Sequence, residues 1–165
     1  MLFLFCASLS GGSVTLPSPA GVSAFTTVDS TSTVSASSVV ATAEVTADAQ
    51  RLQLSFSTHN SNETCVVLDY RGGSYTGVPI AKTHDTGQSF GSPQCGPISV
   101  TSGQLVIGSI MGFGLGNGLG SGFTSRVSSG SVVAGDQTPS QNGSVSVSQS
   151  GNVSIWDCEL MSFDP

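Results

Sequence analysis

The sequence predicts an all-β fold: a single antiparallel β-sandwich, jelly-roll or immunoglobulin-like, with about nine or ten strands. Three observations predict it. Apolar and polar residues alternate with period two in many short runs, whereas helical periodicity is hard to find. Turn signals built on Gly, Pro, Asn and Asp recur roughly every 8–15 residues. Hydrophobic residues make up 38 % of the 165 residues, enough for one core. A right-handed β-solenoid is the alternative, but no fixed repeat of about 20 residues is found.

The strands of the first half follow from alternation and from the turns between the runs. Leu52, Leu54 and Phe56 alternate with polar residues, which is typical of a half-buried strand. Residues 71–74 carry two glycines and predict a turn. The expected strands of this half lie at residues 13–16, 23–28, 33–45, 52–56, 66–70 and 78–80.

The second half continues the pattern after a break at Pro93, Gly96 and Pro97. Residues 104–111 are the most apolar run, which predicts a central strand. The other expected strands lie at residues 98–100, 123–127, 131–134, 144–148 and 153–163. Alternation predicts a core that includes Leu52, Leu54, Phe56, Val66, Leu68, Leu105 and Ile107.

Two apolar segments lie outside this pattern. From Met111 to Phe123 every second residue is glycine, so an extended ribbon would have one bare face; it is either a mobile loop or a packing and assembly segment. Residues 1–12 are apolar, without basic residues, and are expected to be a signal remnant or a donated strand ahead of a sandwich domain at 13–165. The expected subunit contacts are Leu2, Phe3, Leu4, Phe5, Phe113, Leu115, Leu119 and Phe123.

The charge pattern excludes two classes of partner. Only 8 % of residues are charged, the net charge is -6, and Lys and Arg together number 4. Nucleic-acid binding needs clustered cations that displace counterions from phosphates, and anionic lipid needs the same. No run approaches the roughly 20 apolar residues of a membrane-spanning helix, so no transmembrane segment is expected. The expected partners are therefore copies of the same chain, in an oligomer or polymer, and glycans.

The four cysteines favour disulfides in an extracellular or virion or cell-surface location. No pair has the spacing C-x-x-C, so neither a zinc knuckle nor a redox motif is indicated. Cys65 and Cys95 flank a hairpin-like excursion and are predicted to pair. Cys6 and Cys158 are left to pair with each other or with a neighbouring subunit. Three Asn-x-Ser/Thr sequons support the secretory interpretation and predict N-glycans at Asn62, Asn142 and Asn152.

No catalytic or metal motif stands out, so we expect neither an enzyme nor a cofactor. Asp85-Thr86-Gly87 is the tripeptide of aspartic proteases, but its flanks are polar where those enzymes need apolar strands, and a polar turn is expected. His59 and His84 are the only histidines, and each is expected in an exposed loop. No Asp-x-Asp-x-Asp calcium loop is present.

Four stretches carry a resemblance. They are Leu-x-Leu-x-Phe at 52–56, Leu-Asp-Tyr-Arg-Gly-Gly-Ser-Tyr-x-Gly-Val-Pro-Ile at 68–80, Ser-Gly-Gln-Leu-Val-Ile-Gly at 102–108, and Val-Ala-Gly-Asp-Gln-Thr at 133–138. Over residues 23–163 this succession resembles β-sandwich modules of phage tail and microbial surface proteins.

The resemblance implies a structural, decoration or adhesion unit. We therefore expect a structural subunit of an extracellular, virion-surface or filamentous assembly that acts by self-association. The alternative is a carbohydrate-binding or adhesion module. Its sugar-stacking candidates are Tyr75, Tyr70 and Trp156.

Overall fold

The computed structural model describes residues 1–9, 13–16, 21–32, 37–46, 55–56, 63–71, 73, 75–88, 90–120 and 122–165, with only the backbone of 55–56. Within these residues there are strands and no helix, and every strand pairing is antiparallel. The predicted all-β, antiparallel, sandwich-like architecture is therefore confirmed. None of the described segments is a helix long and apolar enough to span a membrane.

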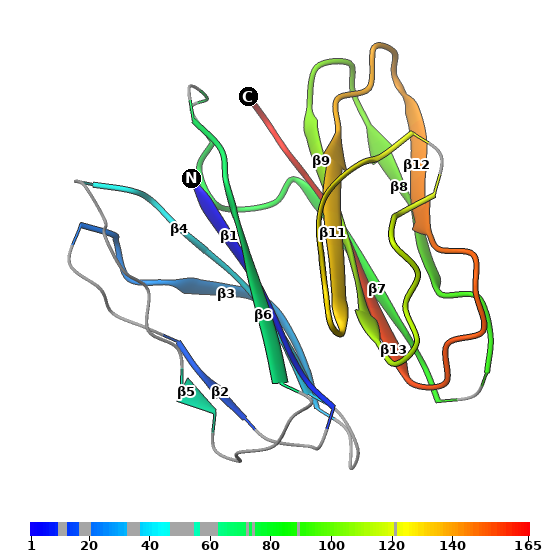
Figure 1. Cartoon of the computed structure of the whole chain (residues 1–165). Coiled ribbons are helices and arrows are strands. Elements are labelled where there is room, and N and C mark those ends of the chain that lie inside the picture. Colours follow the sequence, from blue (N-terminus) through cyan, green and yellow to red (C-terminus); the bar gives the residue numbers. More distant parts are fainter. Residues whose placement is uncertain are drawn as a thin grey trace.

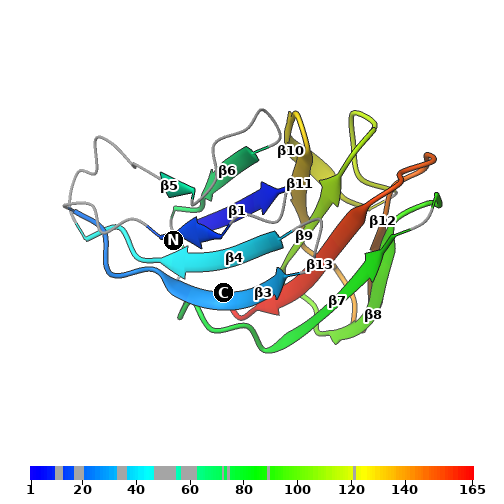
Figure 2. The same ribbon diagram turned by 90° about the horizontal axis from the view of Figure 1, so that it is seen from below.

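Two larger sheets pack against each other (Figures 1 and 2). The four-stranded sheet has the order β3 (Thr26–Ser32), β4 (Ser37–Ala43), β1 (Leu2–Ser8) and β6 (Glu63–Asp69). The five-stranded sheet has the order β10 (Thr124–Ser129), β11 (Val132–Gln137), β9 (Leu105–Gly112), β13 (Trp156–Phe163) and β7 (Ala81–Gly87). Two smaller pairs are β12 (Gly143–Ser148) with β8 (Gln94–Val100), and β2 (Val14–Thr15) with β5 (Ser55–Phe56).

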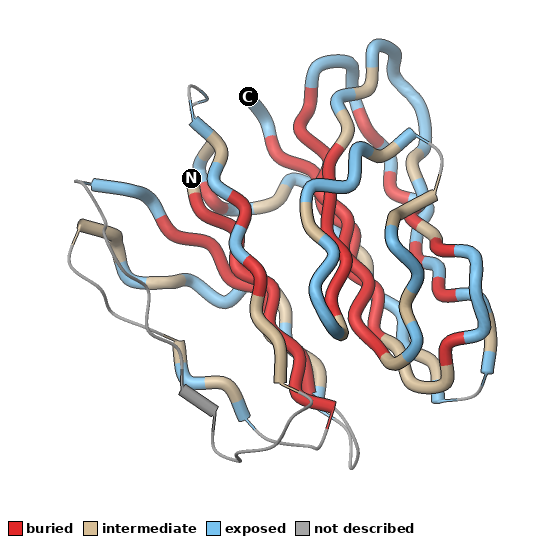
Figure 3. Tube along the Cα trace, viewed as in Figure 1, coloured by how far each residue is buried: buried red, intermediate tan, exposed pale blue. Residues whose placement is uncertain are grey.

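The central strands β9 and β13 of the five-stranded sheet are buried on both faces, and Figure 3 shows them almost entirely red. On β9, Leu105, Ile107 and Met111 belong to a first core cluster, which they share with residues of the four-stranded sheet. Val106 and Ile110 point the other way, into a second cluster with β8 and β12. The pair β8–β12 thus adds a layer that a two-sheet sandwich does not have.

Strand β1 corrects the prediction for residues 1–12. It is not an appendage but an inner strand of the four-stranded sheet, paired with β4 on one side and β6 on the other. All seven of its residues are buried, and Phe3 and Phe5 belong to the first core cluster. The expectation that Leu2, Phe3, Leu4 and Phe5 contact another subunit is wrong. The segment is apolar on both faces because it is a central strand covered on both sides.

The glycine-rich segment is a loop between β9 and β10, not an extended ribbon. Gly114 and Gly122 adopt φ of 79° and 91°, which reverse the chain where a side chain would be strained. Leu115, Leu119 and Phe123 pack against the second core cluster of their own chain. Phe113 is half-buried and its N–H donates to the carbonyl of Ile155. These side chains therefore pack within their own chain but stay half-buried, and their contact with another subunit stays a prediction.

Both disulfides differ from the predicted pairing. The bonds are Cys6–Cys65 and Cys95–Cys158, so Cys65 does not pair with Cys95. Cys6 and Cys65 stand opposite each other on the β1–β6 ladder. Cys95 on β8 reaches Cys158 on β13 inside the second core cluster. The excursion between residues 65 and 95 is not a hairpin, because it crosses from the four-stranded sheet to β7 and β8.

The structure also tests the predictions for single core residues, for one short strand and for two polar segments. Val66, Leu68, Leu105 and Ile107 are buried as predicted. Leu52, Leu54 and the side chain of Phe56 lie outside the described residues. Residues 78–80 form bends rather than a strand. Asp85-Thr86-Gly87 and His84 lie on strand β7 and not in turns or loops, although Asp85 and His84 are exposed as expected.

Candidate functional site

Two carboxyl side chains interrupt the apolar face of β13. Alternate residues of a strand share a face, and Met161 and Phe163 on this face belong to the first core cluster. Asp157 and Glu159 precede them with the same spacing and are buried as well. Carboxyl groups are rarely buried unless they are paired, so this end of the sheet interface differs from the rest of the core.

Strand β3 brings a third carboxylate to the same end. Asp29 lies on the edge strand of the four-stranded sheet, and Lys82 lies on the edge strand of the five-stranded one. The Lys82 Nζ donates to Asp29 Oδ2 at 3.0 Å and to the carbonyl of Val28 at 2.7 Å. Nδ1 of His84 lies 3.7 Å from the same Asp29 oxygen. We call the group Asp29, Lys82, His84, Asp157 and Glu159 the acidic seam.

Glu159 is the most deeply buried member of the acidic seam. It stands opposite His84 of β7 and Ser109 of β9 in the two ladders that flank β13. Its exposed fraction is 0 %, and within the described part of the chain neither carboxyl oxygen has a hydrogen-bond partner. Burial, and then the nearby Asp157 and Asp29, raise the pKa of Glu159 to about 9, while Lys82 acts in the opposite direction. Glu159 is therefore poised to hold a proton or another cation.

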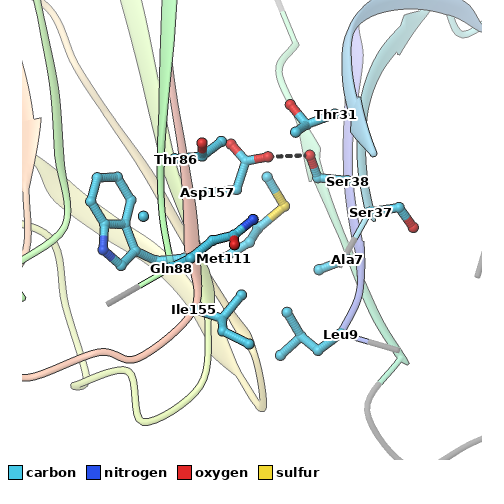
Figure 4. Close-up of a pocket in the computed structure, with 12 residues that line it drawn as sticks. Ala7, Leu9, Thr31, Ser37, Ser38, Thr86, Gln88, Met111, Ile155 and Asp157 are labelled. Atoms are coloured by element: carbon cyan, nitrogen blue, oxygen red, sulfur yellow. Dashed lines mark hydrogen bonds between the residues drawn. The ribbon is translucent and has the colours of Figure 1, made fainter. Parts of the chain in front are cut away.

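Asp157 lies closer to the four-stranded sheet. The Ser38 hydroxyl of β4 donates to its Oδ2 at 2.5 Å, and Figure 4 shows the two side chains pointing toward one another between the sheets. Burial raises the pKa of Asp157, and the hydrogen bond from Ser38 opposes that rise. Beside it lies a cavity of about 20 Å³, lined by Ala7 and Leu9 on the side of the four-stranded sheet and by Met111 on the side of the five-stranded sheet (Figure 4). That volume suits about one water molecule.

The geometry of the seam favours ion binding over hydrolysis. Asp29, His84 and Glu159 each offer a ligand atom, and the three atoms lie within 4.8 Å of one another. Hydrolysis of a glycoside would need a sugar ring between two carboxyl groups. The cavity of about 20 Å³ beside the seam is far too small for one.

A second polar region lies on the surface near β6 and β10. Tyr70, Arg71, Arg126 and Asp69 line an open depression of about 350 Å³. The Arg126 guanidinium donates two hydrogen bonds to Asp136, at 2.7 and 3.0 Å, and the Tyr70 hydroxyl donates to the same carboxylate. Burial, and then the hydrogen bond to Asp136, raise the pKa of Tyr70.

Two of the three sugar-stacking candidates lie at this depression or beside it. The rings of Tyr70 and Tyr75 are 6.5 Å apart, and both side chains are half-buried against the first core cluster. Trp156 lies elsewhere, at the start of β13, where it packs against the second cluster. The structure therefore brings Tyr70 and Tyr75 together and separates Trp156 from them.

The sequon asparagines are placed in part. Asn142 and Asn152 are exposed. The Asn142 side chain accepts a hydrogen bond from the Ser102 N–H at 2.9 Å. Asn62 and His59 lie outside the described residues. Two of the three expected glycosylation sites are thus on the surface, as attachment of a glycan requires.

Sequence reasoning missed the acidic seam. One signal was present: Asp157 and Glu159 share the period of Met161 and Phe163, which places them on the core face. The other half of the site is Asp29, which is 130 positions away from Glu159, and no local pattern links the two. Comparison with known proteins adds nothing to this assignment, because no family model, no curated protein and no solved structure matches the chain.

Proposed function

We propose that this protein is a structural subunit of an extracellular or virion-surface assembly, and that copies of it associate through the edge formed by strand β7. The supporting observation is where the exposed large apolar residues gather. Within the described residues there are five of them, and three, Val78, Ile80 and Phe90, lie in the stretch that contains β7. Their exposed fractions are 63 %, 59 % and 72 %.

Strand β7 has the properties of a docking edge. It ends the five-stranded sheet, and among the described residues only β13 forms a ladder with it, although β8 packs beside part of it without pairing. Soluble proteins protect such edges with charged side chains. Here Lys82 and His84 are directed to Asp29 of the other sheet. Backbone hydrogen bonds along the edge would supply affinity, and the apolar residues at its two ends would fix the register.

The two disulfides and the low charge support an extracellular setting for this role. Disulfides form and persist in oxidising compartments. Each one here ties together two strands of the described fold, which suits a subunit that must keep its shape in an assembly. The predicted self-association is thus proposed again, but its main surface moves from Leu2–Phe5, which are buried, to β7.

The oligomeric state tests this proposal. Sedimentation velocity and electron microscopy of the purified chain should show dimers or polymers. Ile80→Glu and Phe90→Glu should each weaken association at least tenfold, about 1.4 kcal/mol. Val45→Glu is the matched control, because Val45 is 44 % exposed but lies on the other sheet's side of the molecule. A parent protein that stays monomeric at high concentration would refute the proposal.

Glycan binding is the second candidate, and the depression at Tyr70 favours it. Sugar sites combine an aromatic ring with polar and charged groups that fix orientation. The depression offers Tyr70 with Arg71 and Arg126, and although these two pair with Asp69 and Asp136, their guanidinium groups suit an anionic group of a glycan. On a glycan array, Arg71→Ala should abolish binding and Asp85→Asn should preserve it. If the parent protein binds no glycan, the glycan-binding proposal is refuted and the assembly proposal is unaffected.

A further inference from the structure

We propose that Asp29, His84 and Glu159 form a binding site for a divalent transition-metal ion of the zinc class. The inference does not depend on the proposed function. It rests on three side chains from three strands, β3, β7 and β13, whose ligand atoms lie within 4.8 Å of one another.

Glu159 supplies the second observation that points to a ligand. Its exposed fraction is 0 %, both carboxyl oxygens lack a hydrogen-bond partner among the described residues, and one of them lies within 4.8 Å of the ligand atoms of Asp29 and His84. A buried polar group without a partner costs free energy, and buried charges are normally paired or coordinate metals. A cation between the three side chains would supply the missing partner.

The ligand set selects the kind of ion. One imidazole nitrogen with two carboxylate oxygens is a mixed set that suits Zn²⁺ and its neighbours, whereas Mg²⁺ and Ca²⁺ prefer oxygen alone. Bonds of about 2.1 Å put two ligand atoms of a tetrahedral ion about 3.4 Å apart. Rotation of side chains closes the remaining distance, because 44 % of the His84 side chain is exposed and Glu159 breaks no hydrogen bond when it moves.

The charges of the site match such an ion. Asp29 and Glu159 together carry two negative charges when ionised, which balances a divalent cation. The Asp29 oxygen that would bind the ion now accepts a hydrogen bond from Lys82. Lys82 has 45 % of its side chain exposed, so its ammonium group has a path to solvent as the ion enters. Asp29 and His84 lie at the edge of the interface and give the ion its route in.

Metal titration of the untagged, chelator-treated full chain tests the site. Calorimetry with Zn²⁺ should show one ion bound per chain, more tightly than Mg²⁺ or Ca²⁺. Co²⁺ should give visible absorption bands characteristic of a site with a nitrogen ligand. His84→Ala and Glu159→Gln should each weaken Zn²⁺ binding at least tenfold and remove the Co²⁺ bands.

Two controls make the test specific. Asp85→Asn changes an exposed carboxylate next to His84 in sequence, and His59→Ala removes the only other histidine of the chain. Both should leave the affinity for Zn²⁺ unchanged. The inference is overturned if the parent binds no Zn²⁺, if His84→Ala and Glu159→Gln bind it as tightly as the parent, or if His59→Ala alone abolishes binding.

Discussion

At the scale of one residue, Glu159 is a candidate binding group because burial of its carboxyl group lowers the stability of the fold. A glutamate beside Met161 and Phe163 has no hydrogen-bond partner for either oxygen among the described residues, and the charge of Lys82 offsets only part of the cost of its burial. An apolar side chain of similar size would fit the same face better. The presence of the carboxyl group is therefore explained by what it binds and not by packing.

We predict that Glu159→Met stabilises the metal-free protein. The substitution replaces a buried, unpartnered carboxyl group with an unbranched apolar side chain of similar length. The free energy of unfolding should rise by about 1–3 kcal/mol, as for other buried ionic groups that are replaced by apolar ones. Urea denaturation in the presence of a chelator measures it. A loss of stability would show that the carboxyl group has a stabilising partner in the fold.

At the scale of the element, strand β1 shows which kind of strand the alternation of apolar and polar residues does not predict. Alternation predicted strands that have one polar face, and it located the buried residues Val66, Leu68, Leu105 and Ile107. It failed for residues 2–8, which are apolar on both faces and so carry no period-two signal. A continuous apolar run at the start of a chain has the same appearance as a targeting segment. Only its pairing with β4 and β6 identifies it as a central strand.

We predict that Phe5→Ala destabilises the folded domain itself. Phe5 is fully buried in the first core cluster, so its truncation leaves a cavity between the two large sheets. The expected loss is about 3–5 kcal/mol in the free energy of unfolding. Val67→Ala, at a 37 % exposed position of β6, is the control and should cost far less. Denaturant unfolding measures both, and equal losses would contradict the placement of β1.

Each disulfide should contribute to stability on its own. The bonds Cys6–Cys65 and Cys95–Cys158 close loops with sequence separations of 59 and 63 residues. Replacing either pair by serine should cost about 2–4 kcal/mol, because the unfolded chain regains the entropy of an open loop. Thermal unfolding measures the loss, and peptide mapping without reduction checks the pairing. Detection of a Cys65–Cys95 peptide would refute the pairing described above.

At the scale of the whole molecule, the layering decides which strands are most protected. Strands β9 and β13 lie between two core clusters, and β1 and β4 are the inner strands of the other sheet. Strands β3, β7 and β10 lie at sheet edges. The sequence indicated that residues 104–111 are central, but it gave no sign of the extra layer formed by β8 and β12. Contacts between layers join residues that are distant in sequence, so they leave no local pattern.

The rates of amide hydrogen exchange should follow this difference in protection between inner and edge strands. Amides of β1, β9 and β13 should exchange only through global unfolding, since each strand is hydrogen-bonded on both sides and buried. Amides of β3, β7 and β10 should exchange faster by local opening. Mass spectrometry of peptides after deuterium labelling measures both sets. Faster exchange in β9 than in β10 would contradict the layered arrangement.

The order of the cysteines along the chain has a consequence for biosynthesis. Four cysteines allow three pairings, and here the first joins the second while the third joins the fourth. Of these four cysteines, Cys6 and Cys65 are synthesised before Cys95 and Cys158. The bond Cys6–Cys65 can therefore close before Cys95 and Cys158 emerge, and it leaves those two to pair with each other. Oxidative folding of this domain should depend little on disulfide isomerases, because the four thiols are synthesised in the order in which they pair.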